Sequence, residues 1–149
     1  MRARTHAPGS RDTSQRRAIW QVLKATNRPL TAAEILEAAR ASVPGMGVAT
    51  VYRAVKALQS DGTLHQVDLP GDVPRYELSG KGHHHHFHCR SCERVFEVHA
   101  CPGDFRHLAP PGFSLETHEV ILYGRCATCA RQPGHGPREN KGRRTRTDR

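Results

Sequence analysis

Apolar residues near the start of the chain recur with the spacing of a helix. Ile19, Trp20 and Leu23 form one such stripe, and Thr13 stands where an N-cap residue is expected. Asn27-Arg28-Pro29 interrupts the pattern, because proline has no N–H and disfavours a continued helix. We therefore predict a helix that begins at Thr13 and ends before the proline.

Two further helices are predicted downstream. Thr31 and Glu34 have the spacing of a capping box, in which the hydroxyl and the carboxylate satisfy exposed backbone N–H groups. The helix that follows is expected to run to about Ala41. A third helix is predicted over residues 49–58, before the stop signal Asp61-Gly62. Its apolar face consists of Val51, Val55 and Leu58.

A β-hairpin is predicted next, because residues 63–69 and 73–79 are strand-like and are joined by the turn signal Pro70-Gly71-Asp72. Three helices followed by a hairpin is the order of a winged helix-turn-helix. In that arrangement the third helix enters the major groove and the hairpin, or wing, lies against the DNA backbone. The pattern alone also allows a helical bundle that binds no DNA.

Length and charge add only broad limits. A chain of 149 residues allows one domain or two small ones. Residues 1–17 carry five Arg against one Asp, for +4, and residues 131–149 carry seven Lys or Arg against two acids, for +5, whereas the segment between them is neutral. Such basic tails attract polyanions, although a role in solubility explains them equally well.

The N-terminus has no apolar core after its charges, and no apolar run approaches the ~20 residues of a membrane span. We therefore predict a cytoplasmic protein without a membrane partner, whose cysteines are reduced. Two C-x-x-C pairs then supply the four thiolates of a tetrahedral structural zinc site: Cys89, Cys92, Cys126 and Cys129. Disulfides or redox centres are the alternatives, and they would need an export route.

Five histidines lie among residues 83–88, more than the zinc site of the cysteines can use. An affinity tag is a poor explanation, since tags lie at termini. Successive side chains of an extended segment alternate, so His84 and His86 share one face and His83 and His85 the other. Two separate metal sites are therefore predicted.

Five further features of the chain occur together: Gly47-Val48-Ala49-Thr50-Val51-Tyr52-Arg53, Arg75-Tyr76-Glu77-Leu78, the run of residues 83–92, His118, and Tyr123-Gly124 followed by Cys126. In combination they resemble the ferric uptake regulator family, which includes iron-, zinc- and peroxide-sensing repressors. The resemblance covers about residues 12–130. It implies an α+β homodimer on a palindromic double-stranded DNA operator, with metal at an inter-domain site.

The resemblance also sets the expected domain boundaries. A winged-helix DNA-binding domain is expected over residues 12–79. A small α/β dimerisation domain, which contains the structural zinc of the four cysteines, is expected over 80–130. Basic disordered segments are expected at 1–11 and 131–149.

Metal ligands follow from the same resemblance. His84 and His86 match the family's sensing pair, and Glu77 matches its hinge carboxylate. Glu97 matches a further carboxylate that often completes the site, although a solvated strand residue is the alternative for it. His65 falls where zinc-sensing relatives tend to have an acidic ligand.

A second site is implied in the dimerisation domain. Its expected ligands are His83, His85, Asp104 and His118, with Asp104 as our candidate for the acidic residue that normally contributes. Cys101 is either a packing residue or a metal contact that replaces the cysteine of zinc-sensing relatives, since Ser79 occupies that position here. His88 and His99 are expected to be surface imidazoles.

For DNA, we expect contacts to the groove and phosphates from Thr50, Tyr52, Arg53 and Lys56, while Arg16 and Arg17 position the first helix on the backbone. Arg28-Pro29-Leu30 replaces the histidine that many iron and peroxide sensors have before the second helix. Peroxide sensing is therefore the least favoured function.

The sequence favours a repressor of metal-uptake genes, with Zn(II) structural and Zn(II) or Fe(II) regulatory, and zinc the preferred signal. An iron(II)-sensing repressor and a cytosolic zinc buffer are the alternatives. A zinc hydrolase or deaminase is disfavoured, because neither H-E-x-x-H nor H-x-E with P-C-x-x-C occurs. No small-molecule substrate is expected.

Overall fold

The computed structural model describes the backbone of residues 10–132 and the side chains of residues 14–132. Most of the two tails that were predicted to be disordered lies outside these described residues. Helices and strands occupy the described range in the order of an α+β fold, as predicted. None of the helices within it is long and apolar enough to cross a membrane.

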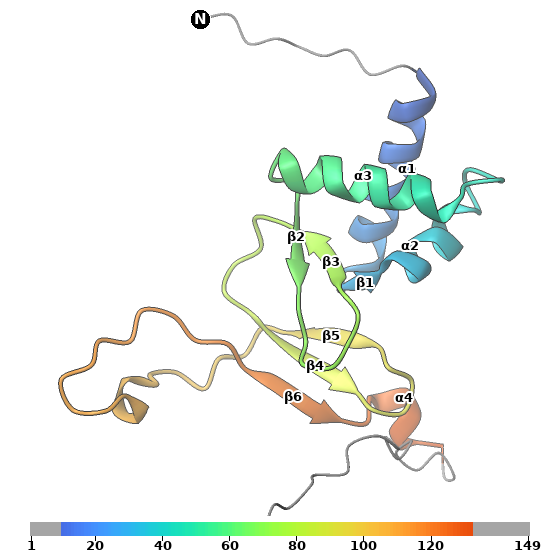
Figure 1. Ribbon diagram of the computed structural model, residues 1–149. Helices are drawn as coiled ribbons and strands as arrows, with labels where there is room; N and C mark the ends of the chain where they lie inside the picture. The colour runs from blue at the N-terminus through green and yellow to red at the C-terminus, as the bar shows by residue number, and fades with distance from the viewer. Residues whose placement is uncertain (1–9, 133–149) are drawn as a thin grey trace, which may run out of the picture.

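The first half of the chain packs helices on a small antiparallel sheet (Figure 1). Its elements are α1 (Ser10–Thr26), β1 (Leu30–Thr31), α2 (Ala32–Ala39), α3 (Val48–Ser60), β2 (Leu64–Val67) and β3 (Arg75–Leu78). Strand β3 lies between β1 and β2. The apolar faces of the three helices meet in one core, in which Ile19, Ile35 and Val51 are fully buried.

Local sequence signals explain most of these elements. Thr31 accepts a hydrogen bond from the Glu34 backbone N–H at 3.2 Å, and the Glu34 carboxylate accepts from the Thr31 N–H at 2.9 Å, so the capping box is confirmed. The hairpin of β2 and β3 is confirmed as well. The predicted cap at Thr13 is wrong, because α1 begins at Ser10 and Thr13 lies inside it.

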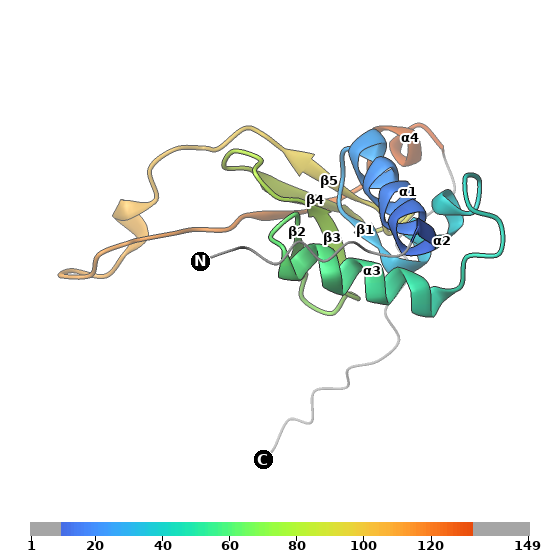
Figure 2. The same cartoon turned by 90° about the horizontal axis from the view of Figure 1, so that it is seen from above.

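The second half is a separate three-stranded sheet. Strand β4 (His85–Cys89) lies between β5 (Val95–Val98), which is antiparallel to it, and β6 (Ile121–Gly124), which is parallel. A short helix, α4 (Ala127–Ala130), follows β6. Between β5 and β6 the chain makes a long excursion away from both sheets, here called the arm (residues 100–118), which contains the 3-10 turn η1 (Arg106–Leu108) (Figure 2).

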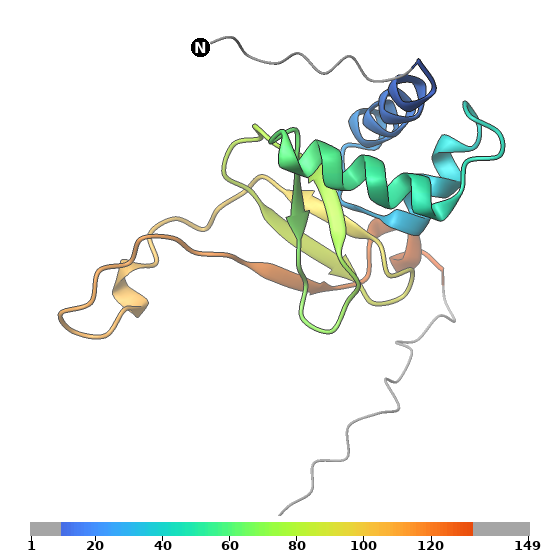
Figure 3. The same ribbon diagram turned by 45° about the horizontal axis from the view of Figure 1, so that its top comes forward.

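The hairpin of the first half lies against the second sheet (Figure 3). Val67 and Leu69, at the end of β2, form a small apolar cluster with Val95 of β5, and Ile121 of β6 packs against it. The two halves are therefore in direct contact through the wing. This contact brings side chains of β2 and β3 close to the histidines of β4.

Candidate metal centres and DNA-binding face

The four cysteines of the two C-x-x-C pairs converge at one end of the second sheet. Cys89 ends β4 and is fully buried, while Cys126 directly precedes α4. The Sγ atoms of Cys92 and Cys126 are 3.9 Å apart, and all four sulfurs lie within 4.8 Å of one another. Zn–S bonds of about 2.3 Å in a tetrahedron require sulfur separations of about 3.8 Å. The group therefore fits a structural zinc, and all five cysteines are free of disulfides.

Backbone N–H groups prepare the first of these thiols for metal. Burial alone would raise the pKa of Cys89, but hydrogen bonds from the backbone of Cys126, Cys92 and Ser91 outweigh it and lower the pKa to about 6. The Cys126 N–H donates to Cys89 Sγ at 3.3 Å. Because the thiolate is the form that binds metal, these donors favour zinc loading.

A second centre gathers around Glu77, which lies on β3 and is 1 % exposed. Its Oε1 lies 2.7 Å from His65 Nε2, 3.0 Å from His84 Nε2 and 3.5 Å from His86 Nε2. The donor atoms of Glu77, His84 and His86 all fall within 4.8 Å of one another. The Glu77 carboxylate therefore lies close to imidazoles from the wing and from the segment that includes β4.

The orientation of His84 suits a metal at this centre. Its Nδ1–H donates to the Gly82 carbonyl at 2.8 Å, which leaves the Nε2 lone pair directed at the site. Glu77 Oε2 and His86 Nε2 are buried without a hydrogen-bond partner. Buried polar atoms are normally satisfied, so these two are available as ligand atoms for an ion. The residues therefore fit a metal ion.

Glu97 is placed differently from the other expected sensory residues. It pairs with His86 across β4 and β5, and its side chain is 4 % exposed, so the alternative of a solvated strand residue is wrong. Its carboxylate is in contact with the Lys81 ammonium, which also lies 3.7 Å from Glu77 Oε2. A lysine that sequence reasoning missed thus stands between the two carboxylates.

A cavity of about 270 Å³ lies beside this centre, between the two halves. Its lining includes His65 and Glu77 from the wing and His84 and His86 from the second half, together with Val120. A ligand bound there would contact both halves at once. This position is the one that a metal needs in order to control their relative orientation.

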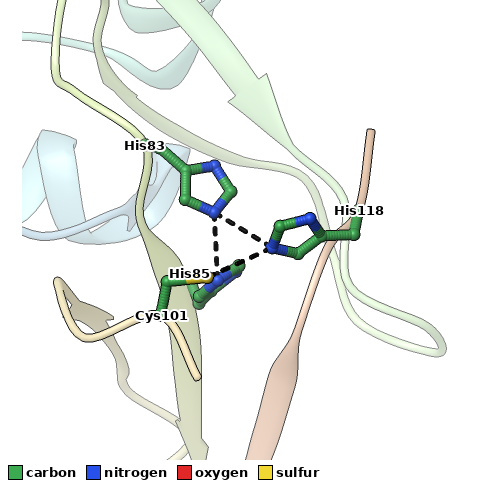
Figure 4. A group of neighbouring side chains, drawn as sticks. All are labelled: His83, His85, Cys101 and His118. Carbon is green, nitrogen blue, oxygen red and sulfur yellow. Dashed lines mark hydrogen bonds between the residues drawn. The ribbon is translucent and has the colours of Figure 1, made fainter. Parts of the chain in front are cut away.

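The opposite face of β4 contributes to a third group (Figure 4). His83, His85 and His118, which were predicted to share a site, lie together there, and the fourth member is Cys101. Asp104 is not brought to this group. Its carboxylate is exposed and bonds Arg106 two residues away, at 2.8 Å to Nε and 2.7 Å to Nη2.

The two remaining histidines differ from each other. His99 is exposed over 70 % of its side chain, as expected for a surface imidazole. His88 is 16 % exposed and lies 4.0 Å from Asp72 Oδ2, so the expectation of a surface residue is wrong for it. Neither belongs to a metal-compatible group among the described residues.

The outer face of α3 is accessible for DNA. Tyr52 is 53 % exposed, and Arg53 and Lys56 are exposed beside it. Thr50 is half-buried and accepts a hydrogen bond from Arg53 Nη2 at 3.3 Å. On α1, Arg17 is exposed, whereas Arg16 forms an ion pair with Asp61 at 2.9 Å. The six residues expected to contact DNA therefore occupy α1 and α3.

Fold and sites together define a winged-helix DNA-binding protein with metal centres at and beyond its wing. The sequence profile of the ferric uptake regulator family matches residues 7–123. The chain belongs to this family. It is accordingly a metal-responsive transcriptional regulator and not an enzyme.

Individual relatives agree with this assignment. The chain is 29% identical over 131 residues to the peroxide operon regulator of Bacillus subtilis, covering 85% of this chain and 89% of the relative. It is 30% identical over 126 residues to the ferric uptake regulation protein of Bordetella parapertussis, covering 81% and 90%. The solved ferric uptake regulator of Vibrio cholerae is similar at 27% identity and a TM-score of 0.60, covering 75% of this chain and 88% of that one.

Proposed function

We propose that this protein represses metal-uptake genes when zinc binds at the centre of His65, Glu77, His84 and His86. Zinc there would hold the wing and the second sheet in one relative orientation. The free energy of metal binding would then favour the arrangement of helices that fits the operator. Without metal the two halves would lose this constraint, and the operator would be released.

The observation that carries the proposal is the position of Glu77. It is buried on the wing, yet its Oε1 faces the imidazoles of His84 and His86 from the other half. Among the residues that the structure describes, Glu77 is the one acidic residue that belongs to a metal-compatible group. A metal bound to Glu77 and these imidazoles therefore connects the two halves directly.

The donor set supports zinc as the signal. His65 lies 2.7 Å from Glu77 but outside the group of donor atoms within 4.8 Å of one another. If metal draws it in, three imidazoles and one carboxylate would give a four-coordinate, nitrogen-rich site, which zinc favours. Iron(II) is the second candidate, since imidazole and carboxylate also suit it and the Glu97 carboxylate lies one strand away. Lys81 in contact with Glu97 favours the smaller coordination number, because it keeps that carboxylate occupied.

We further propose that two copies bind a palindromic operator in the cytoplasm, each with α3 in the major groove. The edge strand β6 supports self-association, because Leu122 and Tyr123 are exposed over 45% and 41%. Phe113 on the arm is exposed over 73%. Apolar surface of this kind at a sheet edge is characteristic of an interface.

The test is fluorescence anisotropy with a labelled fragment from this gene's own upstream region. The full-length protein, with only its cysteine-bound zinc, is titrated with Zn(II) or with anaerobic Fe(II). We expect tight operator binding at low free zinc and little response to iron. A response to iron alone would replace zinc sensing by iron sensing, and binding of zinc without any DNA response would leave a zinc buffer.

Two variants make the result specific. His65→Ala removes the imidazole that the wing contributes, so it should weaken the zinc response. His107→Ala removes an exposed imidazole from the arm, outside the metal-compatible groups of the described residues, and should leave the response unchanged. Equal behaviour of the two variants would contradict the assignment of His65 to the sensory centre.

A further inference from the structure

The base of the arm holds a second group of metal donors with a sulfur among them. His83 and His85 come from the segment that enters β4, whereas Cys101 and His118 come from the two ends of the arm (Figure 4). His83 Nε2 lies 3.2 Å from His85 Nε2 and 3.1 Å from His118 Nε2. Cys101 Sγ lies 3.3 Å from His118 Nε2.

These separations are those of ligands around one small ion. Zn–N bonds of about 2.0–2.1 Å and a Zn–S bond of about 2.3 Å place the corners of a tetrahedron about 3.3 Å apart for two nitrogens and about 3.6 Å apart for nitrogen and sulfur. All four donor atoms lie within 4.8 Å of one another. The geometry therefore matches a tetrahedral site of three imidazoles and one thiolate.

Oxygen donors are absent from this group. Asp104, three residues after Cys101, is engaged by the Arg106 guanidinium and by the Arg106 backbone N–H. Sulfur ligands select for soft or borderline ions, whereas carboxylates suit manganese and magnesium. Replacement of a carboxylate by Cys101 therefore changes which metals the site accepts.

We propose that Cys101 is a thiolate ligand of a zinc site with His83, His85 and His118, and that this site discriminates against iron(II) and manganese(II). The ion joins the two ends of the arm to the start of β4. It thereby fixes the base of a segment that has only the short turn η1 as regular structure. This inference holds whichever metal the inter-domain centre senses.

A metal-free hydrogen-bond cluster is the rival explanation. The Val120 N–H donates to His85 Nδ1 at 3.3 Å, which places the His85 proton on Nε2, where it can be donated to His83. Zinc at His85 Nε2 needs the tautomer with the proton on Nδ1, so zinc binding would move the proton to Nδ1 and break the hydrogen bond from Val120. The rival predicts that the four residues bind no ion and that Cys101 reacts freely whether or not zinc is present.

Cobalt(II) spectroscopy on the full chain separates the two explanations. The inter-domain ligands contain no sulfur, so with zinc retained in the four-cysteine site any sulfur-to-cobalt charge-transfer band reports Cys101 alone. We expect this band in the wild type and its loss in Cys101→Ser, with the zinc content of the four-cysteine site unchanged. Absence of the band in the wild type, or its persistence in the variant, would overturn the proposal.

Alkylation gives a readout that does not depend on cobalt. Cys101 is exposed, so iodoacetamide should modify it in protein that has only the zinc of the four-cysteine site. One further equivalent of zinc should slow this reaction by at least tenfold in the wild type, and His118→Ala should abolish the protection. Equal modification rates with and without zinc in the wild type would contradict a thiolate ligand.

Metal competition tests selectivity. In Cys101→Asp an oxygen replaces the sulfur, so the ratio of zinc affinity to manganese affinity at this site should fall by roughly tenfold or more. Glu116→Asp, at an exposed position of the arm, is the matched control and should leave the ratio unchanged. A ratio in Cys101→Asp that stays within twofold of the wild type would show that the thiolate does not set selectivity.

Discussion

Arg75 Nη2 donates a hydrogen bond of 2.7 Å to the carbonyl oxygen of Glu93. Glu93 lies in the turn that follows the first C-x-x-C pair and leads into β5, so this bond joins the wing to that turn. The Arg75 side chain is 4% exposed, and its guanidinium also pairs with Asp72 at 2.8 Å and Glu34 at 3.3 Å. Glu93 has a φ of 59°, a left-handed conformation that costs about 1 kcal/mol or more for a residue with a side chain. Arg75 therefore helps to hold a strained turn beside the four-cysteine site.

Arg75→Met should destabilise the protein by about 3 kcal/mol, because Asp72 and the Glu93 carbonyl lose their guanidinium partner and Glu34 keeps only Arg28. Thermal denaturation of the zinc-loaded protein measures the effect. Arg106→Met removes an exposed guanidinium from the arm and should change the unfolding free energy by less than about 0.5 kcal/mol. A similar small effect for Arg75→Met would show that the link between the halves is unimportant for stability.

Glu77→Gln should abolish the metal response of DNA binding while the fold remains. The amide keeps the size of the carboxylate but loses the charge that a metal requires. We expect the affinity of the inter-domain centre for zinc to fall by more than about 100-fold, since changes outside the ligand shell already cost 10–100-fold. Isothermal titration of protein whose four-cysteine site retains its zinc checks this, with Glu116→Gln on the arm as the control.

Lys81→Met should strengthen metal binding at the same centre. The ammonium neutralises Glu97 and lies near Glu77, so an incoming cation must compete with it for these carboxylates. Without the lysine, the negative charges of Glu77 and Glu97 lose their ammonium partner, and a bound cation would take its place. We expect the zinc affinity to rise and the metal-free protein to become less stable. Lys24→Met, on α1 over the Trp20 ring, provides the comparison, and an unchanged affinity for Lys81→Met would exclude competition.

Sequence reasoning succeeded where the relevant geometry is local. The capping box of Thr31 and Glu34 depends on a three-residue spacing, and the separation of His84 and His86 from His83 depends on strand alternation. Both patterns can be read without knowledge of the tertiary structure. The sites themselves, and their metals, stay predictions.

What sequence reasoning left open or assigned wrongly depends on how distant segments pack. Cys101 contacts His118 only because the two ends of the arm meet. The Asp104 carboxylate is instead bound by the Arg106 guanidinium and does not join the histidines. Lys81 reaches the inter-domain centre because the segment between β3 and β4 folds back beside Glu77. No periodicity in the sequence encodes such contacts, so spacing alone could not assign these residues.

Zinc should stabilise the protein less at pH 6 than at pH 8. Burial alone would lower the pKa of His84, but its hydrogen bonds to the Gly82 carbonyl and Glu77 outweigh this and raise the pKa above its ordinary value. Burial alone would raise the pKa of Glu77, but the nearby imidazoles of His86 and His84 outweigh it and lower this pKa to about 2. The carboxylate therefore stays ionised across this range, and only the imidazole changes its charge.

The sign follows from linkage. A raised histidine pKa contributes stability that is fully present below about pH 6.5 and is lost as the pH rises through the folded-state pKa. At pH 6 the metal-free protein is stabilised by protonated His84 paired with Glu77. Zinc needs the neutral imidazole of His84, so it competes with this proton. The zinc-induced rise in Tm, measured at both pH values, should shrink at pH 6, and His84→Gln should reduce this dependence. An equal rise at both pH values would contradict the proposed competition.

Arg53→Ala should abolish operator binding without loss of metal or self-association. Arg53 is exposed on the outer face of α3, where its Nη2 bonds Thr50 Oγ1 instead of a core residue, so its removal leaves the fold intact. One arginine contact to DNA contributes about 1–3 kcal/mol, and a dimer loses it twice. Anisotropy with zinc-loaded protein measures the loss, while zinc content and sedimentation confirm the remaining properties. Arg106→Ala removes the same charge from the arm, and similar operator affinities for the two variants would mean that α3 is not the DNA-reading helix.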